Sequence, residues 1–201
     1  SSLRELVSTL KEIRFTSPIP PSVNSYLGKR VAYNPVTNKP YVHVYETKEA
    51  KDYKRYMKLA LERAKKKYGW ERTDKHTYVV CEITVFINAK RKDSDNMFKC
   101  LLDTIVEADL VYDDSMIMPR VTNIFIDKDK PRLEVRMYVS EKVGIFKDRK
   151  TFEIFEESNC KTCNRYARNC SIRREALENK LKTELETISF CTSYRPKKGE
   201  S

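Results

Sequence analysis

The segment that most constrains the fold is a helical pattern with acidic residues at both ends, in residues 90–114 (KRKDSDNMFKCLLDTIVEADLVYDD). Asp93 and Asp95 precede the pattern, and Asp113 and Asp114 follow it. Between them, residues 96–109 carry an apolar stripe at helical spacing. The stripe consists of Phe98, Leu101, Leu102, Ile105 and Val106. If the chain turns back after this helix, carboxylates from both of its ends meet at one place.

Converging carboxylates predict a site for a hard divalent cation, because Mg²⁺ and Mn²⁺ prefer oxygen ligands. The candidate ligands are Asp93, Asp95 and Asp114. Crowded carboxylates repel one another, and a bound cation stabilises their ionised forms. In phosphodiester hydrolysis such an ion lowers the pKa of water and stabilises the leaving oxygen. Lys99, one helical turn after Asp95, would add a positive charge beside the scissile phosphate.

A purely structural interpretation of the same residues is also open at this stage. Asp95 would be the N-cap of the helix, and Asp93 would lie near the positive end of the helix dipole. The D-x-D-N sequence alone does not decide between a cap and a metal site.

Charge and composition limit the class of partner. The chain has 201 residues, a formal net charge of +11 and a pI near 9.3, which favours nucleic acid or an anionic lipid surface. Polar residues interrupt the longest apolar runs, so no membrane segment is expected. Six cysteines without a secretory signal predict a reducing compartment, the cytoplasm.

Basic residues gather in three segments that could contact a phosphate backbone. These are a polar loop before residues 41–45, a helix from Thr47 to Gly69, and the residues just before Asp93. The expected DNA contacts are Lys29, Arg30, Lys54, Lys58, Lys90, Arg91 and Lys92. The alternative is an ordinary solvated surface, which carries lysines for solubility alone.

The remaining patterns predict an α+β domain of four or five strands and two main helices. Residues 1–13 are expected to form an amphipathic helix. The expected strands are residues 13–19, 41–45, 78–87, 116–126 and 132–139, which alternate or run apolar. Residues 127–131 are expected to form a hairpin turn between the last two strands.

Three motifs resemble the RusA family of Holliday junction resolvases, small metal-dependent endodeoxyribonucleases of bacteria and phages. They are residues 20–26 (PPSVNSY), residues 92–103 with KDSDN, Lys99 and LLD, and residues 111–117 (VYDDSMI). The similarity extends from about Arg14 to Val139. The resemblance implies a RusA-like mixed β-sheet and a homodimer that nicks four-way DNA junctions symmetrically in recombination and repair.

The resemblance also assigns roles to the acidic residues. Asp93, Asp95 and Asp114 would be the essential carboxylates that hold Mg²⁺ or Mn²⁺, and Lys99 the essential lysine. Supporting roles are expected for Asp103, Asp113 and Asn96. Alternatives are a nuclease for flaps or forks, a non-catalytic junction-binding protein, and an RNA-binding regulator.

Residues 141–201 have no counterpart in this resemblance, so we expect a nuclease domain in residues 1–140 and a cysteine-rich helical module after it. Residues 141–155 are expected to be a partly extended linker, and residues 172–188 a helix. The candidate ligands for Zn²⁺, or as a second choice an iron–sulfur cluster, are Cys160, Cys163, Cys170 and Cys191. Four free thiols are the alternative. Cys81 and Cys100 fall on apolar faces and are expected in the core.

Overall fold

A computed structural model describes residues 11–89, 97–185 and 188–197 of the chain. The chain divides into two compact units. The first unit contains Ser1–Asp74 and Val79–Val139, and the second contains Lys75–Tyr78 and Ser140–Ser201.

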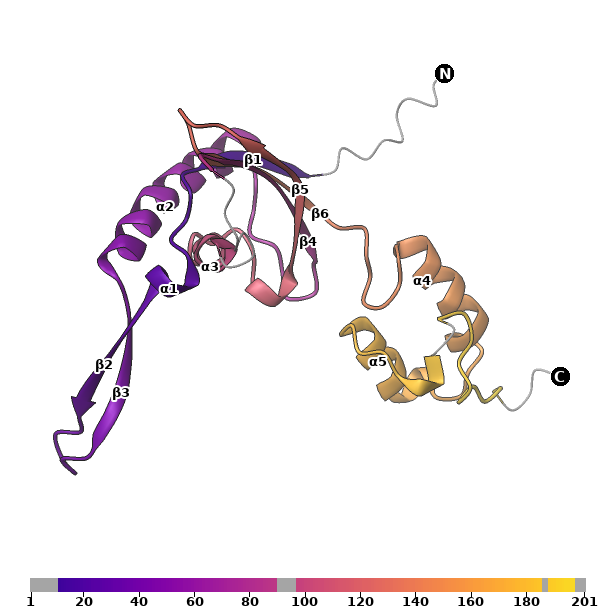
Figure 1. Ribbon diagram of the computed structural model, residues 1–201. Helices are drawn as coiled ribbons and strands as arrows, with labels where there is room; N and C mark the ends of the chain where they lie inside the picture. The colour runs from indigo at the N-terminus through magenta and orange to yellow at the C-terminus, as the bar shows by residue number, and fades with distance from the viewer. Residues whose placement is uncertain (1–10, 90–96, 186–187, 198–201) are drawn as a thin grey trace, which may run out of the picture. The chain divides into compact units, whose positions relative to one another are not determined.

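The first unit is built on a mixed four-stranded sheet in the order β1-β6-β4-β5 (Figure 1). Its strands are β1 (Glu12–Ser17), β4 (Val79–Ile87), β5 (Ile117–Ile126) and β6 (Arg132–Val139). β6 pairs antiparallel with β1 and with β4, whereas β5 pairs parallel with β4. This sheet and its helices confirm the predicted α+β class.

The connection from β4 to β5 explains the strand order. Parallel neighbours need a crossover, and α3 (Phe98–Glu107) provides it. β5 then occupies one side of β4, and β6 pairs on the other side. The predicted hairpin turn at residues 127–131 is therefore wrong, because this segment passes the end of β4 from one side to the other. The backbone amide of Asp127 donates to the carbonyl of Ile87 at 2.8 Å, at that end of β4.

The core of the first unit lies on one face of the sheet. Cys81, Ile83 and Val85 alternate along β4 and are fully buried. Met57 and Leu61 are also fully buried, and they lie on helix α2 (Lys48–Tyr68), which contacts β1 and α3. The strand periodicity and the helix periodicity therefore meet in one apolar layer.

Helix α2 (Lys48–Tyr68) begins and ends at the residues that its sequence predicts. The side chain of Thr47 is the N-cap and accepts a hydrogen bond from the backbone amide of Ala50. At the other end, Gly69 has φ of 60°, a left-handed conformation that ends the helix.

Helix α3 buries a face that is rotated from the predicted stripe. Its buried residues are Cys100, Leu101, Thr104 and Ile105. Phe98, Leu102 and Val106, which were expected on the stripe, are only half-buried. The hydroxyl of Thr104 donates to the carbonyl of Cys100 at 2.6 Å, and this bond satisfies the polar group inside the core. An apolar pattern cannot indicate such a buried threonine.

A separate two-stranded sheet follows the short helix α1 (Val23–Tyr26). It consists of β2 (Leu27–Tyr33) and β3 (Pro40–Glu46), an antiparallel hairpin that extends away from the helices (Figure 1). The expected strand at residues 41–45 is therefore confirmed. At the base of the hairpin, a Cβ on Gly28 would lie 2.5 Å from the ring of Tyr45, so a larger residue would displace the ring.

The predicted N-terminal helix is replaced by a strand at its end. Residues 1–10 lie outside the described residues. Glu12 and Ile13 belong to β1, where Ile13 pairs with Met137 and is fully buried. Pairing with β6 outweighs the local helical pattern at these two residues.

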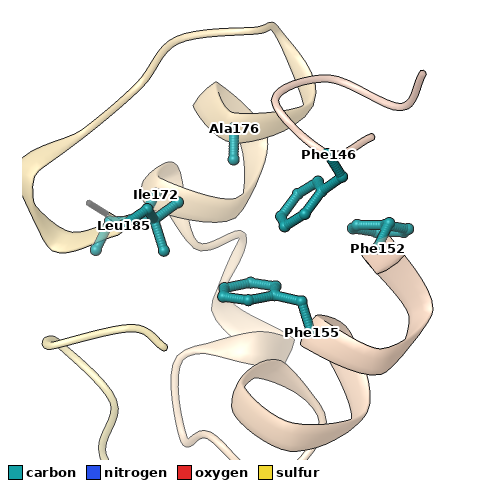
Figure 2. Close-up of a cluster of buried hydrophobic side chains, with 6 residues drawn as sticks. All are labelled: Phe146, Phe152, Phe155, Ile172, Ala176 and Leu185. Carbon is teal, nitrogen blue, oxygen red and sulfur yellow. The ribbon is translucent and has the colours of Figure 1, made fainter. Parts of the chain in front are cut away.

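The second unit is small and helical. It contains α4 (Arg149–Phe155), α5 (Ser171–Leu177) and the helical turns η3 (Glu156–Cys160), η4 (Tyr166–Arg168) and η5 (Thr183–Leu185). Its buried cluster, drawn in Figure 2, consists of Phe146, Phe152, Phe155, Ile172, Ala176 and Leu185. Most of these side chains are aromatic or β-branched. They come from α4, α5, η5 and the segment before α4.

Two expectations for this unit are wrong. The predicted linker contains helix α4, which Asp148 caps by accepting from the backbone amide of Thr151 at 2.7 Å. The predicted helix over residues 172–188 ends at Leu177, because Asn179 has φ of 64° and turns the chain.

Among the described residues, no helix combines the length and apolar character needed to cross a membrane.

Leu61→Ala is expected to destabilise the first unit by about 2–5 kcal/mol, because the lost side chain leaves a cavity in the core. Leu59 is 61% exposed on the same helix, so Leu59→Ala is the matched control, with an expected change below about 0.5 kcal/mol. Urea unfolding followed by the fluorescence of the buried Trp70 measures both variants. Equal losses in the two variants would contradict the assigned core face.

Candidate active site

Lys99, near the start of α3, contacts one residue of the same helix and one residue that follows it. Its ammonium donates to Asp103 Oδ1 at 2.7 Å and to Asp114 Oδ2 at 2.9 Å. Asp114 begins η2 (Asp114–Met116), the short helical turn that precedes β5. The chain therefore turns back after α3, and a residue 15 positions after Lys99 reaches the first half of the helix.

Lys99 and its two carboxylate partners are partly exposed to solvent. The exposed fractions of the side chains are 51% for Lys99, 43% for Asp114 and 20% for Asp103. The hydrogen bonds to Asp103 and then Asp114 raise the pKa of Lys99, so its ammonium stays charged at neutral pH. Exposed ion pairs contribute at most about 1 kcal/mol to stability. These ion pairs therefore add little to stability, and their main effect is to hold Lys99 beside Asp103 and Asp114.

Tyr26 connects the same carboxylate to the base of the hairpin. Its hydroxyl donates to Asp103 Oδ2 at 2.7 Å and lies 3.3 Å from Glu46 Oε1. Burial raises the pKa of Tyr26, and the hydrogen bond to Asp103 raises it further, so the hydroxyl remains a donor. The two oxygens of Asp103 thus accept from different elements, which orients the carboxylate toward Lys99.

A buried ion pair lies behind Tyr26. The ammonium of Lys54 is ion-paired with Glu46, lies 2.5 Å from Glu107 Oε1, and lies 5.0 Å from the centre of the Tyr26 ring. Burial lowers the pKa of Lys54, but the hydrogen bonds with Glu107 and Glu46 outweigh it and raise the pKa overall. A buried charge needs such partners, so Lys54 ties α2 to α3 and to β3.

The position of Lys54 corrects a prediction. We expected Lys54 and Lys58 on the solvent-exposed side of α2, in contact with DNA. Lys54 is only 4% exposed, which contradicts the expected position. The side chain of Lys58 is 42% exposed, as expected, and its Nζ binds Glu107 Oε2 at 2.6 Å, so its contact with DNA stays a prediction. Helical periodicity places residues around an axis, but it does not show that glutamates from two other elements surround a lysine.

The two neighbouring aspartates after α3 have different environments. Asp113 caps η2, because its Oδ1 accepts from the backbone amide of Ser115 at 3.0 Å and from its hydroxyl at 2.5 Å. These hydrogen bonds from Ser115 lower the pKa of Asp113. Asp114 instead lies against Lys99. The geometry gives Asp113 a capping role and directs Asp114 to the site.

Several predicted site residues cannot be placed. Lys90, Arg91, Lys92, Asp93, Asp95 and Asn96 lie outside the described residues, so their roles stay predictions. By sequence, Asp95 precedes Lys99 by four residues.

The side chains around Lys99 suit a hard cation, because they offer carboxylate oxygens as metal ligands. Within the three described ranges, no three or more histidine, cysteine or acidic side chains are already placed to hold a metal ion. Asp93 and Asp95 lie outside those ranges. Asp114 is therefore the described member of the predicted ligand set, with Asp103 beside it.

The β2–β3 hairpin presents basic and aromatic side chains to solvent. Lys29 and Arg30, both predicted DNA contacts, are exposed. The guanidinium of Arg30 lies 5.6 Å from the centre of the Tyr45 ring, and His43 stacks on Tyr45 at 6.1 Å between ring centres. Basic and aromatic groups in one arm are typical of surfaces that bind nucleic acid.

The cysteines fall into two groups. Cys81 and Cys100 are buried, as predicted, and burial raises the pKa of Cys81 to about 12 and that of Cys100 to about 11. Both thiols are therefore unreactive at neutral pH. The other group, Cys160, Cys163, Cys170 and Cys191, lines one cavity of the second unit.

The sequence interpretation missed the polar residues that support the site. These are Tyr26, Glu46, Lys54 in its buried position, and Glu107. Tyr26 belongs to the motif in residues 20–26, which could have indicated a role. The two glutamates belong to none of the three motifs.

Residues 18–138, more than half of the 201-residue chain, match the family model described as Endodeoxyribonuclease RusA. The matched range includes Lys99, Asp103 and Asp114, and it ends within β6. No curated protein matches the sequence.

Lys54→Met is expected to destabilise the protein by about 2–3 kcal/mol, because it removes the buried charge that pairs with both partly buried glutamates and leaves Glu107 only Lys58. Lys58→Met is the matched control, since Lys58 is 42% exposed and contacts only one of these glutamates. Its expected cost is below about 1 kcal/mol. Urea unfolding at neutral pH measures both. A Lys54→Met protein as stable as the control would contradict the buried ion pair.

Proposed function

The chain belongs to the RusA family of endodeoxyribonucleases, and from this premise we propose that it cuts four-way DNA junctions by paired symmetric nicks. The reaction would require Mg²⁺ or Mn²⁺ and would act on Holliday junctions in recombination and repair. The observation that carries the proposal is the hydrogen-bonded group of Lys99, Asp103 and Asp114. This group joins the two ends of α3, as a site built from both acidic clusters requires.

The proposed metal ligands come from both sides of α3. Asp93 and Asp95 precede the helix, and Asp114 follows it. Asp114 is half-exposed, so its carboxylate is accessible to an ion and to DNA. When bound, a divalent cation neutralises the scissile phosphate and lowers the pKa of the attacking water.

Lys99 contributes a positive charge at the same place. Its raised pKa keeps the ammonium charged, and its exposed side chain can exchange a carboxylate contact for a phosphate contact. An ammonium beside the phosphate stabilises the charge that develops on the oxygens as the bond breaks. Asp103 and Tyr26 are positioning residues, because they orient Lys99 through hydrogen bonds.

The surface charge supports a DNA substrate. The chain carries a net charge of +11, and exposed basic residues lie on the hairpin and along α2. The exposed members are Lys29, Arg30, Lys48, Lys51, Arg55, Arg63, Lys66 and Lys67. Phosphate contacts of this kind position the duplex and weaken as salt rises.

Two nicks in one junction call for two active sites, which a homodimer supplies. β5 forms an edge of the sheet, and Val121, Ile124, Phe125 and Ile126 are each 45–57% exposed on it. A long exposed apolar edge strand readily pairs with another strand. We assign this edge to a second copy of the chain, related by a two-fold axis that matches the symmetry of the nicks.

Asp114→Asn and Lys99→Ala are each expected to lower junction cleavage by about 10²-fold or more, with junction affinity nearly unchanged. Asp95→Asn should act in the same way. Asp109→Asn is the matched control, because Asp109 has φ of 61°, which asparagine tolerates, and contacts Arg72 rather than Lys99. Cleavage of synthetic four-way junctions with Mg²⁺ or Mn²⁺, beside gel-shift binding, measures both quantities.

Each other result of this assay has a definite meaning. Normal cleavage by Asp114→Asn would reject the assigned site. Equal cleavage of flaps and forks by the unmodified protein would favour a broader branched-DNA nuclease. Junction binding without nicking at any metal concentration would favour a non-catalytic binding protein.

Ile124→Lys is expected to convert a dimer to a monomer, because it places a charge in the proposed apolar interface. Val36→Lys is the matched control, since Val36 is 91% exposed in the hairpin. Light scattering with size-exclusion chromatography gives the mass of each. A monomeric unmodified protein, or a dimer that survives Ile124→Lys, would contradict the assigned interface.

A further inference from the structure

Four cysteines of the second unit surround one small cavity. Cys160, Cys163, Cys170 and Cys191 all line a cavity of about 20 Å³, although they come from three separate segments of the chain. Apolar side chains, Phe155 among them, line the same space. The proposed nuclease activity does not use these four cysteines, which the fold gathers from distant positions in the sequence.

Backbone hydrogen bonds hold the segments that carry these thiols. The amide of Cys163 donates to the carbonyl of Cys160 at 2.9 Å, which closes the C-x-x-C turn. After Cys191 the chain returns to this turn, where Cys163 forms a β-bridge with Pro196. Local hydrogen bonds therefore hold the backbone around these cysteines, and the side chains of Cys160 and Cys191 also pack against the buried cluster.

Asn159 fixes the position of Cys191 relative to Cys160. It is 3% exposed, and its Oδ1 accepts from the backbone amide of Cys191 at 3.0 Å. Its Nδ2 donates to the carbonyls of Phe155 at 3.1 Å and Ser189 at 3.2 Å. A buried amide with both ends used in this way holds two chain segments in one register, because any shift leaves a buried polar group unpaired.

The second unit has little apolar packing of its own. Among the described residues, its buried cluster consists of six side chains, and partly buried apolar side chains and three of the cysteines pack against them. A unit made of Lys75–Tyr78 and Ser140–Ser201 falls below about 70–80 residues, where a single core rarely suffices and a metal or disulfide often adds stability.

We propose that these four cysteines bind one structural Zn²⁺ ion as thiolates in tetrahedral geometry. Each thiol releases its proton to solvent as its sulfur binds the ion, and no oxidant or reductant is needed. The resulting site carries net negative charge, and Arg165 and Arg173, which also line the cavity, partly offset it. This assignment is independent of the proposed nuclease activity.

The volume of the cavity and the rotation of the cysteine side chains are compatible with the binding of a single ion. The described residues contain no group of three or more potential ligands already in metal-binding geometry. A cysteine thiol changes position by rotation about one bond between staggered positions, so the thiols that line the cavity can move toward an ion when it binds. A cavity of about 20 Å³ accommodates one water-sized guest. A four-iron cluster is several times larger, so zinc fits the space better than iron and sulfide.

Elemental analysis of the full chain, purified under reducing conditions without added metal, tests the assignment. We expect one zinc per chain, no iron, and loss of the zinc in Cys163→Ser and in Cys191→Ser. Cys81→Ala is the matched control and should keep its zinc, because Cys81 lies in the core of the first unit. Cobalt substitution should give the intense absorption of a tetrahedral thiolate site.

Asn159→Ala gives a second readout that does not depend on removing a ligand. We expect zinc affinity, measured by competition with a chromogenic chelator, to fall about 10–100-fold while the cobalt spectrum keeps its tetrahedral form. The proposal is overturned if the purified protein lacks zinc and takes up no cobalt, if it contains iron, or if thiol counting finds two disulfides. Zinc retained after all four cysteines are changed to serine would also overturn it.

Discussion

The contact between Lys99 and Asp114 is the interaction on which the first unit's candidate site depends. It joins a helix to the turn that follows it, and so requires the chain to reverse after α3 and enter β5 beside β4. The crossover from β4 through α3 to β5 makes this return possible, since neighbouring parallel strands must be joined by a crossover connection. Fold and site are therefore consequences of the same connection.

The two central lysines use their charge in different ways. Lys99 is half-exposed, so water screens its ion pairs and they add little stability, but the ammonium remains available to a phosphate. Lys54 is buried, so its charge must stay paired with Glu46 and Glu107 and is not available to DNA. Tyr26 contacts both groups, because Lys54 lies over its ring and its hydroxyl donates to Asp103.

The second unit is organised by a different balance of forces. Its apolar cluster is small, and two of its segments are held by the hydrogen bonds of the buried Asn159. In the first unit, by contrast, a sheet and two helices bury a continuous apolar layer. A small unit with few apolar contacts gains more stability from a metal ion that links its thiols than a unit with a large core would.

The sequence by itself determined the features that depend on near neighbours: the α+β class, helix α2 with its caps at Thr47 and Gly69, and the family motifs. Only the tertiary structure decided which strands are adjacent, which face of α3 is buried, and that Lys54 is inside. Lys54 finds its partners 8 and 53 positions away in the chain. Periodicity reports the surroundings of a residue within a few turns, whereas such pairing depends on where distant elements pack.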